Sequence, residues 1–505
     1  MSISQKYTRA ELVLVTIVLA VATFMQVLDS TIANVAVPTI SGDLGVSSTV
    51  GTWVITGFGA SNAVSIAASG FLAKKVGEVR LLLISTALFT LFSFLAGISN
   101  SIGTLIFFRV LQGAVAGPVI PLSQSLLLRS YPPIMKNMAM AFWSMTVILA
   151  PVVGPILGGY ICYNYTWSWI FFINIPLGIA IVIIGIPLLK RLETKPQAIP
   201  FNFISLGLLT IGVGCLQIML DKGNQLGWLA SKQIIILAII SVVSLSYLVI
   251  GELFSQPSTV DFSLFKSRNF TIGTFSVSLA YMAYFGAIVL IPQLLQEVYG
   301  YTALWAGIAL APIGIIPILI SAPLAKLSNK IDIRFVITTS FVFYAICFFW
   351  RAFTYTSNMG LAEVVWPQFI QGIAVACFLM PLTTLTLTGL PENRLASATS
   401  LSNFFRTLAG SVGTSITTTM WSNNAALHHS QLVENINLYN PESTLTYQTL
   451  ERVGLNLQQI SSYLNQQITD QSLIMSANDI FWLSGCTFIL LIMMIWFAKP
   501  SQKVN

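Results

Sequence analysis

The sequence predicts an all-α integral membrane protein with 14 transmembrane helices, arranged as two six-helix bundles with two further helices inserted between them. Composition is the first reason: the 505-residue chain is 55% hydrophobic and only 8% charged, whereas about 25% of the residues of a soluble globular protein are charged. The second reason is the set of apolar stretches that approach the about 20 residues needed to cross a bilayer. The third is that short motifs recur in the same order in the two halves of the chain.

Each predicted span is an apolar run bounded by short polar segments, which hold most of the charged side chains. A signal peptide cleaved after Ala22 is a competing interpretation of the first span, but this cut would fall inside an apolar run that continues to about Pro38. We therefore expect the first helix to be retained. The spans cover residues 12–36, 50–73, 80–98, 102–127, 137–160, 167–189, 203–221, 233–252, 271–298, 303–326, 334–352, 361–386, 396–421 and 478–498.

The distribution of basic residues predicts that both termini lie in the cytoplasm. With the N-terminus inside, 18 of the 24 Lys and Arg residues fall in cytoplasmic segments and four, including Lys222 and Arg351, fall outside. Cytoplasmic loops of membrane proteins carry such an excess of basic residues. Arg109 and Arg406 are then the two basic residues within the membrane. The net charge of +7 reflects loops that face anionic lipid headgroups, and it requires no nucleic-acid partner.

Motifs repeat between the two halves of the chain. Trp53 precedes the tripeptide 72–74 by the same interval at which Trp305 precedes the identical tripeptide 324–326, an offset of 252 residues. The pairs Gln112-Gly113 and Gln371-Gly372, and the glycines Gly154 and Gly413, are related by an offset of 259. A chance match of short motifs in helices rich in Leu, Ala and Gly is the alternative, but the shared order favours two homologous bundles.

The repeat predicts the domain organisation. We expect the first six-helix bundle at 1–189, two inserted helices at 190–265, and the second bundle at 266–505, which includes a polar outer loop at 422–477. Parallel six-helix repeats that meet at a central substrate site are typical of secondary transporters.

A charged pair within the membrane marks the first bundle as the candidate functional site. A cation in the hydrocarbon costs about 2.5–3.5 kcal/mol on insertion scales, so Arg109 should have a buried partner and a function. At 1.5 Å per residue, Asp29 and Arg109 lie at matching depths, about 10–13 Å below the outer surface. Gln26 and Gln112 lie three residues deeper on the same helical faces. A purely structural ion pair is one interpretation.

The other interpretation is proton coupling. Burial raises the pKa of a carboxyl group and a nearby Arg lowers it, so Asp29 could bind a proton in one access state and release it in another. At the repeat offsets, Asp29 corresponds to Tyr281 and Arg109 to Gln368. The candidate coupling charges therefore belong to the first bundle alone.

The fifth span carries a helix-packing motif. Its prolines remove backbone donors and bend the helix, and its glycines leave a groove in which another helix can approach closely. The spacing of the run GPILGG is more specific than a single GxxxG. The motif residues are Pro151, Gly154, Pro155, Gly158 and Gly159.

Four segments resemble one transporter family over the whole chain. They are LDSTIANVAVP at 28–38, GFLAKKVGEVR at 70–80, FFRVLQG at 107–113 and GPILGG at 154–159. The chain resembles the 14-helix drug:proton antiporters of the major facilitator superfamily, and most closely the EmrB-type inner-membrane subunits of tripartite efflux pumps. The resemblance implies the major facilitator fold, proton coupling by Asp29 and Arg109, and the antiporter motif in the fifth span. It also implies a cytoplasmic gate at Gly70, Lys74, Gly77, Glu78 and Arg80.

Two positions depart from the family pattern. Lys74 stands where the loop motif of the superfamily usually has an acid, and Glu78 is a candidate replacement. The tenth span lacks the acid that some relatives carry. The ionisable residue of the second bundle is instead Arg406, beside Phe404 and Phe405, which favours neutral or anionic hydrophobic substrates; a structural Arg bound to carbonyl groups is the alternative. Together with these three residues, the substrate-pocket candidates are Gln26, Gln112, Gln368 and Gln371.

The outer loop holds a predicted amphipathic helix that begins at Pro441. Apolar residues at spacings of three and four form one stripe along it. The stripe either packs on the outer face of the transporter or forms a heptad seam for a periplasmic partner, which in the EmrB-type family is a membrane-fusion protein that leads to an outer-membrane channel. The candidate docking residues are Leu450, Val453, Leu457, Ile460 and Leu464.

These observations predict a proton-driven exporter of hydrophobic drugs and toxic compounds, located in the bacterial inner membrane and associated with antibiotic resistance. A same-fold transporter of a physiological metabolite or lipid is the alternative. The sequence has no HExxH, GxSxG or P-loop motif, so we predict no enzymatic activity. The five cysteines are isolated and His428-His429 is a single polar pair, so we predict no metal site and no cofactor.

Overall fold

The computed structural model describes residues 7–132, 135–197, 202–254, 260–328, 331–434, 436 and 440–500, and this part of the chain contains helices and no strands. The helices are α1 (Arg9–Asp43), α2 (Ser48–Gly51), α3 (Trp53–Val76), α4 (Glu78–Gly97), α5 (Ile102–Ala116), α6 (Val119–Ser130), α7 (Lys136–Asn164), α8 (Trp169–Phe172), α9 (Asn174–Leu189), η3 (Lys190–Leu192), α10 (Phe203–Leu226), η4 (Trp228–Ala230), α11 (Lys232–Phe254), η5 (Phe262–Lys266), α12 (Arg268–Glu297), α13 (Ala303–Leu310), η6 (Ala311–Gly314), α14 (Ile315–Leu327), α15 (Ile333–Thr354), α16 (Leu361–Ala376), α17 (Leu379–Leu387), η7 (Glu392–Arg394), α18 (Leu395–Glu434), α19 (Pro441–Arg452) and α20 (Leu457–Ile495).

The 14 predicted spans are all present as helices or as pairs of helices. Thirteen of them are long and apolar enough to cross a membrane, counted over the described residues. The remaining span belongs to α18, which is 40 residues long but rich in Ser, Thr and Asn. Four spans are interrupted: α5 and α6, α8 and α9, α13 and α14, and α16 and α17 each form one crossing. The break before α6 falls at Pro118, which lacks the N–H that a continuous helix requires.

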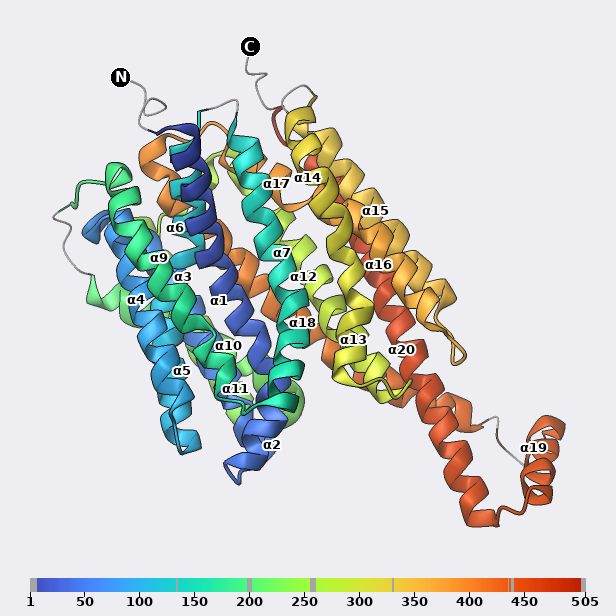
Figure 1. Ribbon diagram of the computed structural model, residues 1–505. Coiled ribbons are helices and arrows are strands. Elements are labelled where there is room, and N and C mark those ends of the chain that lie inside the picture. Colours follow the sequence, from blue (N-terminus) through green and yellow to red (C-terminus); the bar gives the residue numbers. More distant parts are fainter. Residues whose placement is uncertain are drawn as a thin grey trace.

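Both termini lie at one end of the molecule, and we refer to this end as the terminal side and to the opposite end as the far side (Figure 1). The helices α1, α3, α4, α5 and α9 of the first half gather on one flank. The helices α14, α15, α16 and α20 of the second half gather on the other.

The repeat predicted from sequence is visible in the packing of matched glycines. A Cβ atom on Gly154 of α7 would lie 2.3 Å from Thr31 Oγ1 of α1, and one on Gly413 of α18 would lie 2.1 Å from the carbonyl oxygen of Met282 in α12. The helix pairs α1/α7 and α12/α18 are therefore equivalent close contacts in the two halves. The division of the chain at residues 189 and 265 remains a prediction.

Of the two inserted helices, α10 lies against both halves and α11 packs on α10. α10 packs along α11, and it also contacts α3 of the first half and α18 of the second. The hydroxyl of Ser415 in α18 donates a hydrogen bond to the carbonyl oxygen of Leu220 in α10 (2.7 Å). The insert is thus part of the boundary between the two bundles.

On the terminal side the two bundles touch directly. Ser69 of α3 donates a hydrogen bond to Ser400 of α18 (2.7 Å), and Asn403 donates one to Gln124 of α6 (2.8 Å). A Cβ atom on Gly70 would lie 2.9 Å from the Cα atom of Ser397, so the backbones of α3 and α18 meet here. The passage between the bundles is closed at this end.

On the far side, the polar loop predicted at 422–477 is largely helical. α18 continues to Glu434 and α20 begins at Leu457, so both helices project beyond the bundles (Figure 1). The predicted helix does begin at Pro441, but it ends at Arg452 because the chain turns at Gly454, whose φ of +94° favours glycine. The single apolar stripe expected from Leu450 to Leu464 is therefore wrong, because its residues lie on α19, in the turn that follows it, and on α20.

Two basic residues counted on the outer side are buried near the far ends of their helices. Arg351 lies in the last turn of α15 with an exposed fraction of 0%. Lys222 lies near the far end of α10 and is buried as well. Its Nζ lies 5.2 Å from the centre of the Trp53 ring. Their location on the outer side of the membrane remains a prediction.

Candidate functional site

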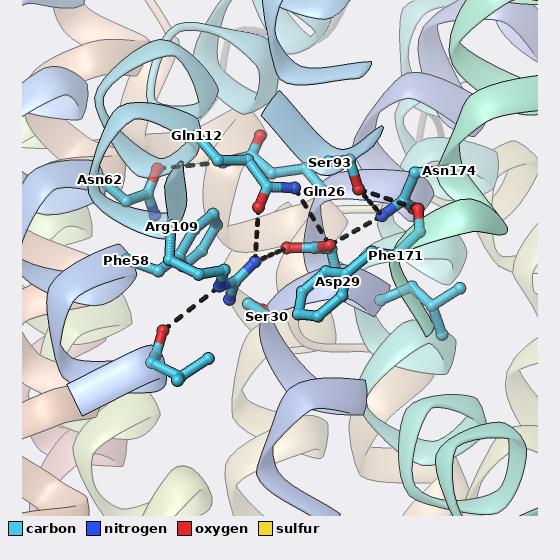
Figure 2. Close-up of polar contacts among 12 residues, drawn as sticks. Gln26, Asp29, Ser30, Phe58, Asn62, Ser93, Arg109, Gln112, Phe171 and Asn174 are labelled. Carbon is cyan, nitrogen blue, oxygen red and sulfur yellow. Dashed lines mark hydrogen bonds and ion pairs between the residues drawn. The ribbon is translucent and has the colours of Figure 1, made fainter. Parts of the chain in front are cut away.

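The intramembrane charges predicted from sequence are in direct contact. Arg109 Nη1 donates to Asp29 Oδ2 at 2.5 Å, and both side chains have an exposed fraction of 0% (Figure 2). Asp29 lies on α1 and Arg109 on α5. The pair is thus buried inside the first bundle rather than placed on the wall between the bundles.

Two further side chains complete the hydrogen bonding of Asp29. Gln112 Nε2 and Asn174 Nδ2 donate to Asp29 Oδ1 at 3.2 and 2.7 Å. Asn174 also donates to Ser93 Oγ at 3.0 Å, which fixes the amide from a third helix (Figure 2). Asp29 therefore accepts hydrogen bonds from α5 and α9 together.

Arg109 has partners besides Asp29. Its Nε donates to the carbonyl oxygen of Val54 (3.2 Å) and its Nη1 also donates to Gln112 Oε1 (2.7 Å). The guanidinium lies over the ring of Phe58, 4.2 Å from the ring centre, where a cation–π interaction adds stability. If Asp29 lost its negative charge, Arg109 would therefore still keep its hydrogen bonds to Val54 and Gln112 and its contact with Phe58.

Gln26 connects the charged cluster to the space between the bundles. It lies one helical turn from Asp29 on α1, and its Nε2 donates to Asn62 Oδ1 of α3 (3.2 Å) (Figure 2). Its Oε1 is buried and has no partner. Gln26 and Asn62 both line a cavity of about 200 Å³, so this amide pair separates the ion pair from the cavity.

The cavity continues toward the far side. A second cavity, of about 560 Å³, shares Ser30, Phe285 and Thr414 with the first and reaches Pro38 and Gln296 near the far ends of α1 and α12. Its walls come from both halves and are predominantly apolar. With the terminal side closed, this arrangement is a vestibule that extends toward the far side.

The second half contributes a cation to the smaller cavity. Arg406 of α18 lines it and is 6% exposed, its guanidinium lies 4.9 Å from the centre of the Tyr281 ring, and its Nε has no hydrogen-bond partner. The aromatic residues that line this cavity are Tyr281 and Phe285 rather than the predicted Phe404 and Phe405. Phe405 instead packs against Phe265 at a ring-centre distance of 5.6 Å.

The predicted glutamines of the second half line the larger cavity. Gln368 and Gln371 both lie on its wall, and Gln371 Oε1 accepts a hydrogen bond from Arg351. Gln112, also predicted as a pocket residue, is instead buried in the charged cluster. Sequence reasoning missed Asn174 and Asn62, and the signal that could have identified them is an amide within an otherwise apolar span.

The antiporter-motif residues have three different roles in packing. Gly154 and Gly158 both lie against α1, where a Cβ atom would be 2.3 Å from Thr31 Oγ1 and 3.0 Å from the carbonyl oxygen of Ile32. Gly159 has no atom within 4 Å of a Cβ position. Pro151 and Pro155 line the larger cavity. The motif thus joins the helix that carries Asp29 to the wall of the vestibule.

The predicted gate residues occupy the terminal side, but Glu78 does not reach the second bundle. Its carboxylate pairs with Arg129 (2.9 Å) and accepts from Ser125 (3.0 Å), both within the first half. Gly77 has a φ of +102°, and a Cβ atom there would lie 2.5 Å from Glu193 Oε1. Glu193 in turn accepts the backbone N–H of Arg80 (3.0 Å), which caps the start of α4.

The charge of Lys74 acts on Asp261, an acid at the end of the inserted segment. Asp261 pairs with Arg394 at 2.8 Å and accepts a hydrogen bond from Ser263 (2.6 Å). Burial raises the pKa of Asp261, but these hydrogen bonds and the charges of Arg394 and Lys74 outweigh it, so the pKa lies below its usual value.

A family model described as Major Facilitator Superfamily matches residues 19–414. The chain belongs to this superfamily. It is 58% identical over 97% of its length, and over 96% of the relative, to "Multidrug export protein EmrB" of Escherichia coli (strain K12). It is 48% identical to "Fatty acid resistance protein FarB" of Neisseria gonorrhoeae, with 97% of each chain covered. The protein is thus an EmrB-type transporter of the major facilitator superfamily, and not an enzyme.

Solved structures agree on the fold. The proton:xylose symporter XylE superposes with a TM-score of 0.59 at 14% identity, with 98% of each chain covered. The human organic anion transporter MFSD10 superposes with a TM-score of 0.58 at 11% identity, covering 95% of this chain and 98% of that one. The major facilitator fold predicted from sequence is confirmed.

Proposed function

We propose that this protein exports hydrophobic drugs and toxic compounds across the bacterial inner membrane in exchange for protons. The terminal side is cytoplasmic in this proposal, so the structure represents an outward-facing state with its vestibule open toward the periplasm. The names of the multidrug-export relatives support the substrate class. The observation that carries the proton coupling is the buried Asp29–Arg109 pair, which lies one turn from a cavity-lining residue.

In the proposed coupling, Asp29 alternates between a charged form bound to Arg109 and a protonated form. A proton that reaches Asp29 in the outward-facing state neutralises it and weakens its bond to Arg109, while Arg109 keeps Gln112 and the Val54 carbonyl. The bond that joins α1 to α5 is then weaker. Both helices belong to the bundle that must rock against the other during alternating access. Each proton that moves inward supplies about 2.3 kcal/mol per 100 mV of membrane potential.

The far-side helices are the candidate docking site for a periplasmic fusion protein and, through it, an outer-membrane channel. α18 and α20 project beyond the bundles and are held together by a hydrogen bond between His428 Nε2 and Asp479 Oδ2 (2.8 Å). Val453 and Leu457 at the tip are 75% and 69% exposed. Exposed apolar residues at the tip of a rigid projection are suited to a protein partner.

The test of this function replaces the coupling carboxylate. Asp29→Asn should fold and insert, because Asn keeps an acceptor for Arg109, but it should abolish accumulation driven by a pH gradient in proteoliposomes. The transported compound is a radiolabelled drug selected from a susceptibility panel on a strain that lacks the gene. Asp43→Asn, an exposed acid at the far end of the same helix, is the matched control and should transport normally. Gradient-driven transport by Asp29→Asn would refute the assignment.

A second candidate function is export of amphipathic lipids such as fatty acids. The FarB relative is named for fatty acid resistance, and Arg406 offers an unpaired Nε to an anion in an otherwise mainly apolar cavity. Competition between a long-chain fatty acid and the labelled drug in the same proteoliposomes would distinguish the two. Transport of the fatty acid without transport of any drug would favour this alternative.

A further inference from the structure

The inserted helix α10 lies between α3 of the first bundle and α18 of the second, and a transporter of two bundles alone has no helix in this place. On the terminal side, α3 and α18 touch each other directly through Ser69 and Ser400. Toward the far side, α10 contacts both helices. Its outer half binds α18 through Gln217, which donates to Ser411 Oγ (3.0 Å), and through the carbonyl of Leu220. α10 therefore fills the space where α3 and α18 diverge.

Asp221 is the acid at this three-helix junction. It lies on α10, accepts a hydrogen bond from Gln217 Nε2 (3.1 Å), and accepts another from the hydroxyl of Thr56 on α3. Because the same Gln217 amide also donates to Ser411, one hydrogen-bonded chain runs from α3 through Asp221 and Gln217 to α18. The two bundles are thus joined through a carboxylate of the inserted helix.

Among the described residues, Asp221 forms no ion pair, although charged groups lie on the helices around it. α3 presents Thr52, Trp53 and Thr56 to α10, and none of these carries a charge. Lys222, the next residue on α10, is the cation whose charge acts on Asp221, but its Nζ contacts Thr52 and Gln225 instead.

The remaining charged residues lie on the other two elements packed against α10. Arg406 lies on α18, more than one helical turn closer to the terminal side than Ser411. α11 carries Lys232 at its first position and Glu252 near its other end. Asp221 itself is only partly buried, so a proton can reach it from the far side.

We propose that Asp221 is a second proton-binding site, separate from Asp29, whose charged form holds the far side open by joining α3 to α18 through α10. The inference rests on the proton-driven export proposed above. It also gives the inserted helices a part in coupling that a 12-helix transporter would not have.

The chemistry follows from the hydrogen bonds. The carboxylate accepts from Thr56 and Gln217 as an anion, and charge-assisted hydrogen bonds are about twice as strong as neutral ones. A proton taken up from the far side forms an O–H bond on the carboxyl group and weakens both contacts. The outer halves of α3 and α18 can then approach each other as the bundles rock toward the state that is closed on the far side.

The experiment measures the opening of the far side as a function of pH in the full-length protein. Spin labels are placed at Gly42 and Asn358, both exposed near the far ends of the two halves, in a background without the five native cysteines. Distances are measured by pulsed electron resonance in lipid nanodiscs, without drug or gradient. We expect the wild type to shift toward the short distance as the pH falls.

Asp221→Asn should remain folded and should populate the short distance over the whole pH range, because its neutral amide mimics the protonated acid. Thr56→Val removes one donor to the charged form and should move the midpoint to higher pH by about one unit. The matched control is Asp470→Asn. Asp470 accepts a hydrogen bond from Gln466, four residues earlier (2.8 Å), on an exposed part of α20, and its replacement should leave the pH response unchanged.

The outcomes separate the two proposals. If the wild type transports no drug under a pH gradient, the proposed function fails. If the wild type is driven by the gradient but Asp221→Asn retains the wild-type pH response of the far side, this inference fails and the proposed function stands. A variant that elutes as aggregate is replaced by Thr56→Val, whose unchanged midpoint would equally overturn the inference.

Discussion

At the scale of single residues, the Asp29–Arg109 pair is poorly explained by stability. Taking two charges out of water costs several kcal/mol per ion, so a buried ion pair is often no more stabilising than apolar residues of similar volume. The pair nevertheless has donors from Gln112 and Asn174 around its carboxylate. Ionisable and polar groups gathered inside the membrane in this way indicate a function.

Replacement of Arg109 by Lys tests whether the geometry of the cation matters. The planar guanidinium donates to Asp29, Gln112 and the Val54 carbonyl at once, and an ammonium group cannot reproduce this arrangement. We expect Arg109→Lys to fold but to shift the pH dependence of export, measured as initial rates in proteoliposomes over a range of pH. An unchanged pH profile would show that Arg109 serves packing alone.

At the scale of helices, close contact with a neighbouring helix explains why glycine occurs at matching positions in the two halves. Gly154 and Gly413 each lie where a Cβ atom would overlap a neighbouring helix. The neighbour of Gly413 is backbone, which cannot move aside as a flexible side chain can.

Alanine substitutions in matched pairs test these contacts. Gly413→Ala should lower stability by about 1–3 kcal/mol, the usual cost of overpacking, whereas Gly410→Ala on the same helix should have little effect because its Cβ would meet only atoms at 3.7 Å or beyond. In α7, Gly154→Ala should likewise be worse than Gly159→Ala. Thermal unfolding of the purified variants in detergent provides the comparison, and equal effects within each pair would contradict the packing argument.

At the scale of the whole molecule, the terminal side is closed by contacts of two kinds. Hydroxyl and amide pairs such as Ser69–Ser400 join the helices of the two halves. The charge of Lys74 in the first half also acts on Asp261, which lies just before η5 and pairs with Arg394.

The lowered pKa of Asp261 predicts how this closure depends on pH. Folding or closure that depresses the pKa of an acid contributes stability above the unfolded pKa, about 3.9 for Asp, and loses it as the pH falls through the lower folded value. The contribution of Asp261 should therefore be constant between about pH 5 and pH 8. Asp261→Asn should increase labelling of a cysteine placed at Ser397 equally across that range. A difference that varies between these pH values would show that Asp261 titrates there.

The projecting helices predict a separation between drug binding and resistance. Val453 and Leu457 are exposed at the tip, but Ile460 is fully buried, so only the first two are free to contact a partner. The double variant Val453→Ser/Leu457→Ser should bind drug normally when purified, yet lower resistance in cells and lose the fusion protein in a pull-down. Ile460→Ser should instead destabilise the projection itself. Capture of the fusion protein by the double variant would exclude this tip as the docking site.

The sequence by itself determined the membrane class, the positions of the spans, the matched glycines of the two halves and the matching level of Asp29 and Arg109 along their helices. These properties depend on local hydrophobicity and on the fixed rise of a helix, which can be read along one segment at a time. The matched glycines were also visible as a repeated spacing, although their neighbours were not.

Only the tertiary structure decided which polar groups meet. Asn174 bonds to Asp29, Asn62 to Gln26 and Arg351 to Gln371, and Asp221 of the inserted helix lies between α3 and α18. Each of these contacts joins different helices, and their meeting depends on how the bundles pack rather than on any local pattern. The prediction of one helix in the outer segment was wrong for a related reason. The apolar spacing continues through Gly454, but the positive φ of this residue ends the helix and turns the chain.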